Sequence, residues 1–352
     1  MTAQTKTTWQ KVKLGDVLNF KYGFSLPAKK RIQGDFPVYG SSGIDGWHNE
    51  AKVEGEGIIV GRKGNVGATY YSEQSFFPID TVYYVDELKK VGDLKFFYYL
   101  LKRIPFKRIG SDVGVPGLNR DLAYGLDVTI PEGKDEQKRI ASILSAFDDK
   151  IELNNKINRT LEQMVQAIFK EWFVTPSKTL SKGWIIMPVK QLVKRLPQGK
   201  TYKPEELQQK GNIPVYDQSS GIILGYHNDE PAFFATTDKP VAIFGDHTCR
   251  MKLITHPCSL GPNVVPFVGI DYPTMFIYFL TQGEIVQREY KRHWTEFEQQ
   301  EFVVPSVDLA EKYVERIKPM VQKIVEAEKE NQSLASLRDL LLPKLMSGRI
   351  RI

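Results

Sequence analysis

Glycines bracket a cationic turn in the segment Gly61-Arg62-Lys63-Gly64-Asn65-Val66-Gly67, which follows an apolar stretch. Two cations and an amide on such a turn can bring side chains and backbone N–H groups close to phosphates or to the edges of bases. The segment is not a nucleotide-binding P-loop, because no Gly-Lys-Ser/Thr sequence closes it. A glycine turn with solvated cations has the same appearance, so this motif alone does not decide the function.

Two other segments combine basic and aromatic residues. Segment 102–111 reads KRIPFKRIGS and is followed by Leu118-Asn119-Arg120, and segment 287–294 reads QREYKRHW. Charge runs usually lie on solvated surface, but both segments precede a long helical pattern, and this recurrence favours a shared surface that binds a polyanion. We therefore expect DNA contacts from Arg62, Lys63, Asn65, Lys107, Arg108, Ser111, Asn119, Arg120, Arg288, Lys291, Arg292 and His293.

A third group of residues has the chemistry of metal ligands. His247, Cys249, His256 and Cys258 spell H-x-C-x6-H-x-C, but this spacing is not that of a common structural zinc site. The first half of the chain has no equivalent, so we expect no metal and no cofactor. A metal-dependent enzyme that uses this cluster stays as one alternative. The two cysteines also exclude a disulfide framework.

An internal repeat organises these segments. Residues 37–49 read PVYGSSGIDGWHN and residues 214–228 read PVYDQSSGIILGYHN, with an offset of 177 between Pro37 and Pro214 in a chain of 352. Each half continues with short β-branched and aromatic runs between glycines, and then with a short apolar helix pattern. The corresponding stretches are 55–85 with 240–268, and 94–104 with 274–282. Two copies of one mixed unit are the simplest account.

Each half ends in a long helix with an apolar seam, whose positions are separated alternately by three and four residues. The seam positions are Ile140, Leu144, Phe147, Ile151, Asn154, Asn158, Leu161, Val165, Ile168 and Trp172 in the first helix, and Ile317, Met320, Ile324, Ala327, Asn331, Leu334, Arg338, Leu341 and Leu345 in the second. Asparagines within a seam cost stability but fix register.

A helix with one long apolar stripe needs a partner, and the other copy in the same chain is the obvious one. The first helix, expected over residues 136–173, would be about 57 Å long. The alternative is that each helix only covers its own domain. We favour the paired arrangement, because so long a helix exceeds the span of a domain of this size.

Composition sets broader limits. With 41% hydrophobic and 26% charged residues, the chain is typical of a soluble protein, and no run approaches the roughly 18 apolar residues that a membrane span needs. The first residues do not form a secretory signal, so we expect a cytoplasmic protein with no membrane partner. The net charge of +6 permits a nucleic-acid partner without requiring one.

The whole chain resembles the specificity subunits of type I restriction-modification systems. The resemblance lies in the order of parts, in VGRKGNVG with Pro78-Ile79-Asp80-Thr81 after it, in Ile130-Pro131 leading into Glu136-Gln137-Lys138-Arg139-Ile140, and in the closing LLPKLMSG. The segment Phe244-Gly245-Asp246-His247-Thr248 resembles an alternative form of the recognition domain, which adds His247, Thr248 and Arg250 to the expected DNA contacts. The second long helix departs from the pattern, because VDLAEKYVERIKP stands where the first has Glu-Gln-Lys-Arg-Ile.

The resemblance implies an α+β fold in which two similar target recognition domains are separated by two long antiparallel helices that form an intramolecular coiled coil with pseudo-twofold symmetry. The implied parts are recognition domains at 1–132 and 176–306, and spacer helices at 133–175 and 307–352. It also implies a non-catalytic subunit that binds double-stranded DNA, two methyltransferase subunits and the translocase-endonuclease subunits.

The two halves differ greatly in sequence, so the DNA target should have two unlike halves. The chief alternative is a coiled-coil scaffolding protein whose globular parts bind protein.

Overall fold

The computed structural model describes residues 8–109, 117–175, 183–219, 223–284 and 291–352. The chain divides into two compact units: unit 1 comprises Met1–Glu152 and Asn331–Ile352, and unit 2 comprises Leu153–Glu330. Both long helices, α3 (Lys134–Phe169) and α8 (Val307–Leu345), therefore contribute residues to both units. A π-helical turn, Lys170–Val174, continues α3 to one residue beyond the predicted end of the first helix.

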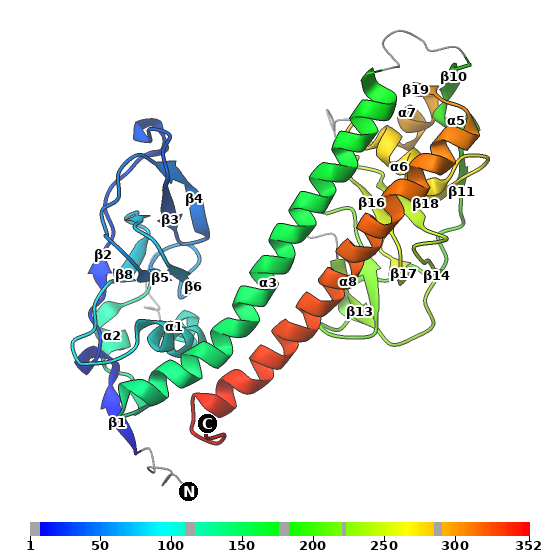
Figure 1. Cartoon of the computed structure of the whole chain (residues 1–352). Helices are drawn as coiled ribbons and strands as arrows, with labels where there is room; N and C mark the ends of the chain where they lie inside the picture. The colour runs from blue at the N-terminus through cyan, green and yellow to red at the C-terminus, as the bar shows by residue number, and fades with distance from the viewer. Residues whose placement is uncertain (1–7, 110–116, 176–182, 220–222, 285–290) are drawn as a thin grey trace, which may run out of the picture. The chain divides into compact units, whose positions relative to one another are not determined.

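The described residues of unit 1 form small sheets and short helices, together with parts of α3 and α8 (Figure 1). Within its described residues the sheets have the strand orders β1-β9, β2-β8-β5-β6 and β4-β3-β7. The bounds are β1 (Trp9–Lys13), β2 (Lys21–Tyr22), β3 (Phe36–Gly40), β4 (Gly43–His48), β5 (Gly57–Gly61), β6 (Thr69–Ser72), β7 (Phe77–Pro78), β8 (Val82–Val85), α1 (Leu94–Arg103), α2 (Arg120–Tyr124) and β9 (Asp127–Pro131).

Unit 2 repeats this topology. Its described sheets have the orders β10-β19, β11-β18-β15-β16 and β13-β12-β17-β14. The bounds are β10 (Ile185–Pro188), α5 (Val189–Leu192), β11 (Val193–Arg195), β12 (Ile213–Tyr216), β13 (Ile223–His227), β14 (Phe233–Phe234), β15 (Val241–Gly245), β16 (Met251–Ile254), β17 (Pro257–Leu260), β18 (Val264–Gly269), α6 (Thr274–Thr281), α7 (Trp294–Gln299) and β19 (Glu301–Val304).

The repeated phrase forms the same hairpin in each unit. Strand β3 pairs antiparallel with β4 and parallel with β7, and β12 pairs in the same way with β13 and β17. The prediction of two similar mixed units with long helices is confirmed. The predicted domain boundaries stay predictions.

Polar contacts connect α3 to the globular part of unit 1. Gln137, which is 2% exposed, donates from Nε2 to the carbonyl of Pro131 at 2.9 Å and accepts at Oε1 from the backbone N–H of Asp93 at 2.9 Å. Asp93 in turn caps α1, because its Oδ1 accepts from the N–H of Phe96 at 2.8 Å. The motif that opens the first long helix therefore joins β9, α1 and α3.

Within each unit α8 lies beside α3 and runs antiparallel to it. In unit 1 Arg338 donates to Asp148. In unit 2 Asn154 Nδ2 donates to Glu330 Oε2 at 2.7 Å, and Asn158 Nδ2 donates to the carbonyl of Ile324 at 3.5 Å. Partner numbers on α8 fall as numbers on α3 rise, which defines the antiparallel direction.

The seam positions are buried or half-buried at every predicted residue of both helices. Some also enter the cores of the units: Ile140 and Leu144 in unit 1, and Val165 and Ile317 in unit 2. The helices therefore cover their units and contact each other, which combines the two arrangements considered from the sequence. Asn158 Oδ1 is buried without a hydrogen-bond partner among the described residues, a cost typical of a polar seam position.

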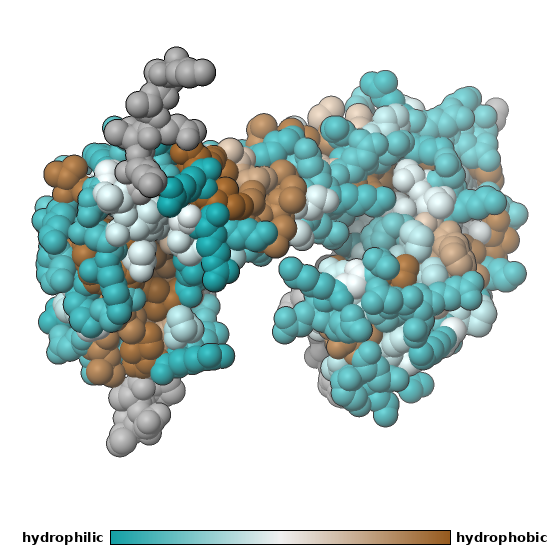
Figure 2. Space-filling view, turned by 90° about the horizontal axis from the view of Figure 1, so that it is seen from below, coloured by the Kyte–Doolittle hydropathy of each residue, from teal (hydrophilic) through white to brown (hydrophobic). Residues whose placement is uncertain are grey.

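None of the helices in the described part of the chain is long and apolar enough to cross a membrane. The face seen in Figure 2 is largely hydrophilic, with separate hydrophobic patches.

Candidate nucleic-acid interface

The turn between β5 and β6 in unit 1 is shaped by glycine. Gly67 has a φ of +78°, and a Cβ added to it would lie 2.5 Å from Cβ of Phe106. This close approach places the short helical turn Phe106–Arg108 against the β5–β6 turn. Lys107 and Arg108 are exposed there. Two basic segments separated in the sequence thus lie together in unit 1.

A third predicted segment joins the same turn through its backbone. Gly117 forms a β-bridge with Lys63, and the N–H of Leu118 donates to the carbonyl of Arg62 at 2.9 Å. The turn is also held by the segment around Thr81, because the N–H groups of Arg62 and Lys63 donate to the carbonyl of Thr81 at 2.9 and 3.1 Å. Lys63 and Asn65 are exposed at its tip.

Two arginines share one tyrosine in this cluster. The guanidinium carbons of Arg62 and Arg120 lie 5.3 and 5.2 Å from the ring centre of Tyr22, which is 50% exposed. Arg62 also lies 5.9 Å from the ring of Tyr83. Burial, and then a hydrogen bond with Tyr22, raise the pKa of Tyr83 to about 12, so this phenol stays neutral beside the cations. A cationic and aromatic surface of this kind suits nucleic acid.

The remaining predicted residues of unit 1 have other roles or lie outside the described residues. Asn119 Oδ1 accepts from the N–H groups of Asp121 and Leu122 at 2.9 and 3.1 Å, so Asn119 is the N-cap of α2. Ser111 lies outside the described residues.

In unit 2, the turn after β15 is organised by a carboxylate. Asp246 is 8% exposed, and its Oδ1 accepts from the N–H groups of His293 and Trp294 at 3.1 and 3.0 Å. Its Oδ2 lies 3.8 Å from Nε of Arg292, whose side chain is 78% exposed. The structure thus brings together the two predicted segments of unit 2, 244–248 and 291–294.

The predicted contacts of unit 2 divide into exposed and supporting residues. Lys291 is exposed and pairs with Glu296 at 2.7 Å. His293 is 1% exposed and holds Glu296 through Nδ1 at 2.7 Å, so its side chain has too little free area to reach a ligand. In this structure His293 supports the turn, and its predicted contact with DNA stays a prediction. The Lys291 ammonium, followed by His293, holds the pKa of Glu296 below its usual range.

Gln218 fixes the tip of the same turn. Its Oε1 accepts from the N–H of His247 at 2.9 Å, and its backbone carbonyl accepts from Oγ1 of Thr248 at 2.7 Å. His247 Nδ1 also lies 3.0 Å from the carbonyl of Lys291. Arg250 is exposed, and Arg288 lies outside the described residues.

The four histidines and cysteines of the H-x-C-x6-H-x-C pattern do not come together in one site. Cys249 and Cys258 are buried in different hydrophobic clusters, and His256 Nε2 lies 2.8 Å from the hydroxyl of Tyr216. Burial raises the pKa of the Cys258 thiol to about 12. Among the described residues, no three His, Cys, Asp or Glu side chains gather as metal ligands.

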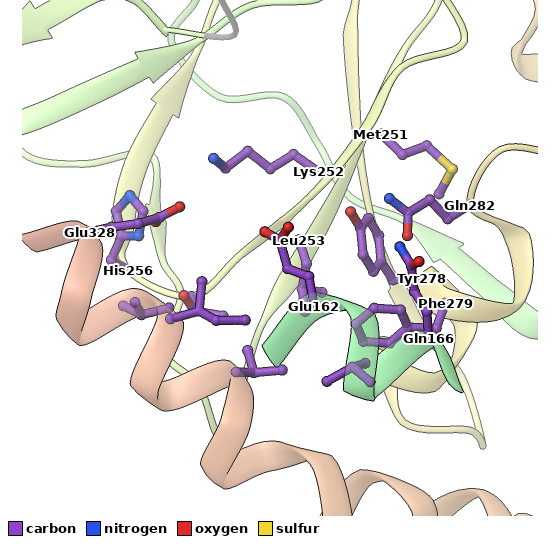
Figure 3. Close-up of a pocket in the computed structure, with 15 residues that line it drawn as sticks. Glu162, Gln166, Met251, Lys252, Leu253, His256, Tyr278, Phe279, Gln282 and Glu328 are labelled. Carbon is purple, nitrogen blue, oxygen red and sulfur yellow. The ribbon is translucent and has the colours of Figure 1, made fainter. Parts of the chain in front are cut away.

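A pocket of about 360 Å³ lies in unit 2 between the long helices and the strand β16 with helix α6 (Figure 3). Glu162 from α3 and Glu328 from α8 line it together with Lys252 and His256. Two carboxylates make this pocket unsuited to a phosphate backbone.

Some residues of these surfaces were not predicted. Tyr22, Tyr83 and Asp246 were not among the expected contacts, and no local pattern marks the first two. Gln218 could have been found from the sequence, because it lies within the second copy of the repeated segment.

Known proteins resemble the chain in both sequence and fold. Residues 6–163 match the family model described as the type I restriction modification DNA specificity domain. The type I restriction enzyme MjaIX specificity subunit of Methanocaldococcus jannaschii is 23% identical over 301 residues, which cover 73% of this chain and 69% of that protein. The MjaVIII specificity subunit of the same organism is 21% identical over an alignment of 398 positions, which covers 98% of this chain and 93% of that protein.

The fold agrees with a solved structure. The S subunit of a type I restriction-modification system from M. genitalium superposes with a TM-score of 0.68 at 20% identity, covering 98% of both chains. Residues 6–163 therefore carry the type I restriction modification DNA specificity domain, and the chain as a whole is similar to specificity subunits of type I restriction-modification systems.

Proposed function

We propose that this chain is the DNA-reading subunit of a type I restriction-modification complex. The single observation that carries the proposal is the same assembly in both units: a turn of the central sheet, β5–β6 or β15–β16, is joined to a basic segment from later in that half. Side chains on such a joined surface can reach base edges, while exposed lysines and arginines neutralise phosphates.

Each unit reads one half of a two-part target, and the two halves differ. Unit 1 presents Arg62 and Arg120 around an exposed tyrosine, whereas unit 2 presents Arg292 and His247 around a buried carboxylate. Because different donors and acceptors recognise different base edges, the target is asymmetric. The lengths of α3 and α8 set the gap between its halves, and the helices serve as spacers between recognition domains at 1–132 and 176–306.

Partner subunits supply the chemistry, so the chain itself is non-catalytic. Leu153, Ile157 and Met164 project from α3 in unit 2 with exposed fractions of 51%, 36% and 45%, although none is a seam position. Their spacing places them along one face of the helix. We assign this face to partner proteins, two methyltransferase subunits and the endonuclease subunits, in the cytoplasm.

The proposal is tested by the salt dependence of duplex binding. The equilibrium constant of the purified chain, alone and with its methyltransferase partner, is measured against salt concentration. A reader of DNA gives a steep negative log-log slope, about −0.9 for each phosphate neutralised. A slope near zero favours the coiled-coil scaffold with protein-binding globular parts. Methylation profiling of the host with and without this chain then identifies the target.

A further inference from the structure

Arg120 is held in an aromatic cradle. Its guanidinium carbon lies 5.2 Å from the ring centre of Tyr22 and 5.8 Å from that of Tyr124. Tyr124 is itself fixed, because its hydroxyl donates to Oδ1 of Asn19 and accepts from the N–H of Phe20, both at 2.8 Å. Its ring also stacks on Phe20 with an interplanar angle of 6°. The orientation of the guanidinium is therefore set before any ligand arrives.

The terminal donors of Arg120 have no hydrogen-bond acceptor among the described residues. Its nearest carboxylate oxygen, Oδ1 of Asp121, lies 4.0 Å from Nε, which is beyond hydrogen-bond distance. Nε is buried without a partner, while the side chain as a whole keeps 37% of its area exposed. The guanidinium is thus rigid, accessible and unsatisfied.

Arg62, on the same tyrosine, differs in this respect. Its Nε and Nη2 both donate to the carbonyl of Asp80, at 3.2 and 2.7 Å. A backbone carbonyl already occupies this side of the guanidinium, so Arg62 is suited to hold Tyr22 and the segment around Asp80. The two arginines share one ring, but only Arg120 keeps both terminal nitrogens free of hydrogen bonds within the described structure.

We propose that Arg120 determines specificity by reading a guanine in the half-site bound by unit 1, and that Arg62 is a positioning residue. A planar guanidinium with two parallel N–H donors matches the O6 and N7 acceptors that guanine presents in the major groove. Stacking on tyrosine lowers the entropy lost on binding, which favours a base contact over a loose contact with phosphate. This inference rests on the proposed function.

The test is enrichment of binding sites from a duplex library with randomised bases, using the full chain with its methyltransferase partner. Arg120→Lys keeps the charge and removes the fork, and Arg120→Ala removes both. We expect each variant to lose preference for one guanine by about tenfold or more, with the other half-site unchanged. Arg349→Lys is the matched control, because Arg349 is exposed in the same unit, lies outside the expected DNA contacts and lacks an aromatic cradle among the described residues. It should leave the motif intact.

Other outcomes overturn the inference in distinguishable ways. Retention of the guanine by both Arg120 variants shows that Arg120 does not read it. Equal weakening for all sequences, with a salt slope reduced by about one, identifies a phosphate contact instead. A wild-type chain that enriches no motif defeats the proposed function and this inference together. Unchanged thermal midpoints of the variants establish that folding is not the cause.

Discussion

Asp148 is the point at which three helices of unit 1 meet, and its removal is the sharpest test of how that unit is held together. From α3, its carboxylate accepts from the hydroxyl of Tyr99 on α1 at 2.6 Å and from Arg338 on α8. Tyr99 is 1% exposed, whereas the side chains of Asp148 and Arg338 are 27% and 19% exposed. Asp148→Ala therefore leaves a buried hydroxyl without its acceptor and breaks a partly solvated ion pair.

The expected cost follows from these exposures. An unsatisfied buried hydroxyl costs about 1–3 kcal/mol, and a solvent-screened ion pair contributes about 1 kcal/mol or less. Arg338 keeps its contact with Asp339 at 2.8 Å, which limits the loss. The free energy of unfolding of unit 1 should fall by about 2–3 kcal/mol, which corresponds to about 4–12 °C in its thermal midpoint for a unit of this size.

Scanning calorimetry of the full chain measures this shift, with Asp149→Ala as the control. Asp149 is the next residue on the same helix and is exposed. Tyr99→Phe removes only the hydroxyl and should cost about 1 kcal/mol. If Asp148→Ala shifts the midpoint no more than Asp149→Ala, the carboxylate does not connect the three helices and the reasoning is refuted.

Three further predictions follow from other parts of the chain. Gly67→Ala should lower the free energy of unfolding, measured by urea denaturation, by about 2–4 kcal/mol, because alanine is strained at a positive φ and its Cβ would crowd Phe106. Gly133→Ala is the control, because a Cβ at Gly133 meets no atom within 4 Å. Equal effects of the two variants would contradict the packing argument. Burial, followed by Lys252 and Lys329, lowers the pKa of His256, so the unfolded chain binds the proton more tightly than the folded chain and stability is lost as pH falls below about 6.5. The variant His256→Gln should therefore show a smaller decrease of the thermal midpoint between about pH 7.5 and 5.5. A decrease as large as that of the wild-type chain would contradict this prediction. Four residues inserted beside Asn154, with four beside Glu330, should lengthen the gap between the half-sites by about 6 Å, or about two base pairs, and methylation sequencing should find both half-sites unchanged.

The repeat and the seams were readable from the sequence because both are periodic. The duplicated phrase around Pro37 and Pro214 predicted two units with matching hairpins, and the alternating spacing predicted the buried faces of α3 and α8. Patterns of this kind depend on local geometry, which the order of residues records directly.

The details of the candidate surfaces were less accessible. Tyr22 lies far in sequence from both Arg62 and Arg120, so their shared stacking arises only from tertiary contacts. The burial of His293 was hidden for a similar reason, since a basic segment such as KRHW looks uniformly exposed in sequence although Asp246 draws its backbone inward. A side chain's role in such places depends on neighbours that no short window contains.

Unit 1 is built from two separate segments of the chain, and this has a consequence for biosynthesis. Leu345 and Met346 are 2% and 1% exposed and pack in one core with Leu14 and Phe20, near the opposite end of the chain. During synthesis, unit 2 can fold first, because its segment Leu153–Glu330 is contiguous. The core of unit 1 stays incomplete until residues 331–352 have been made. The order of folding is thus the reverse of the order of translation. A chain truncated after Glu330 would have a unit 1 that lacks Leu345 and Met346 in its core.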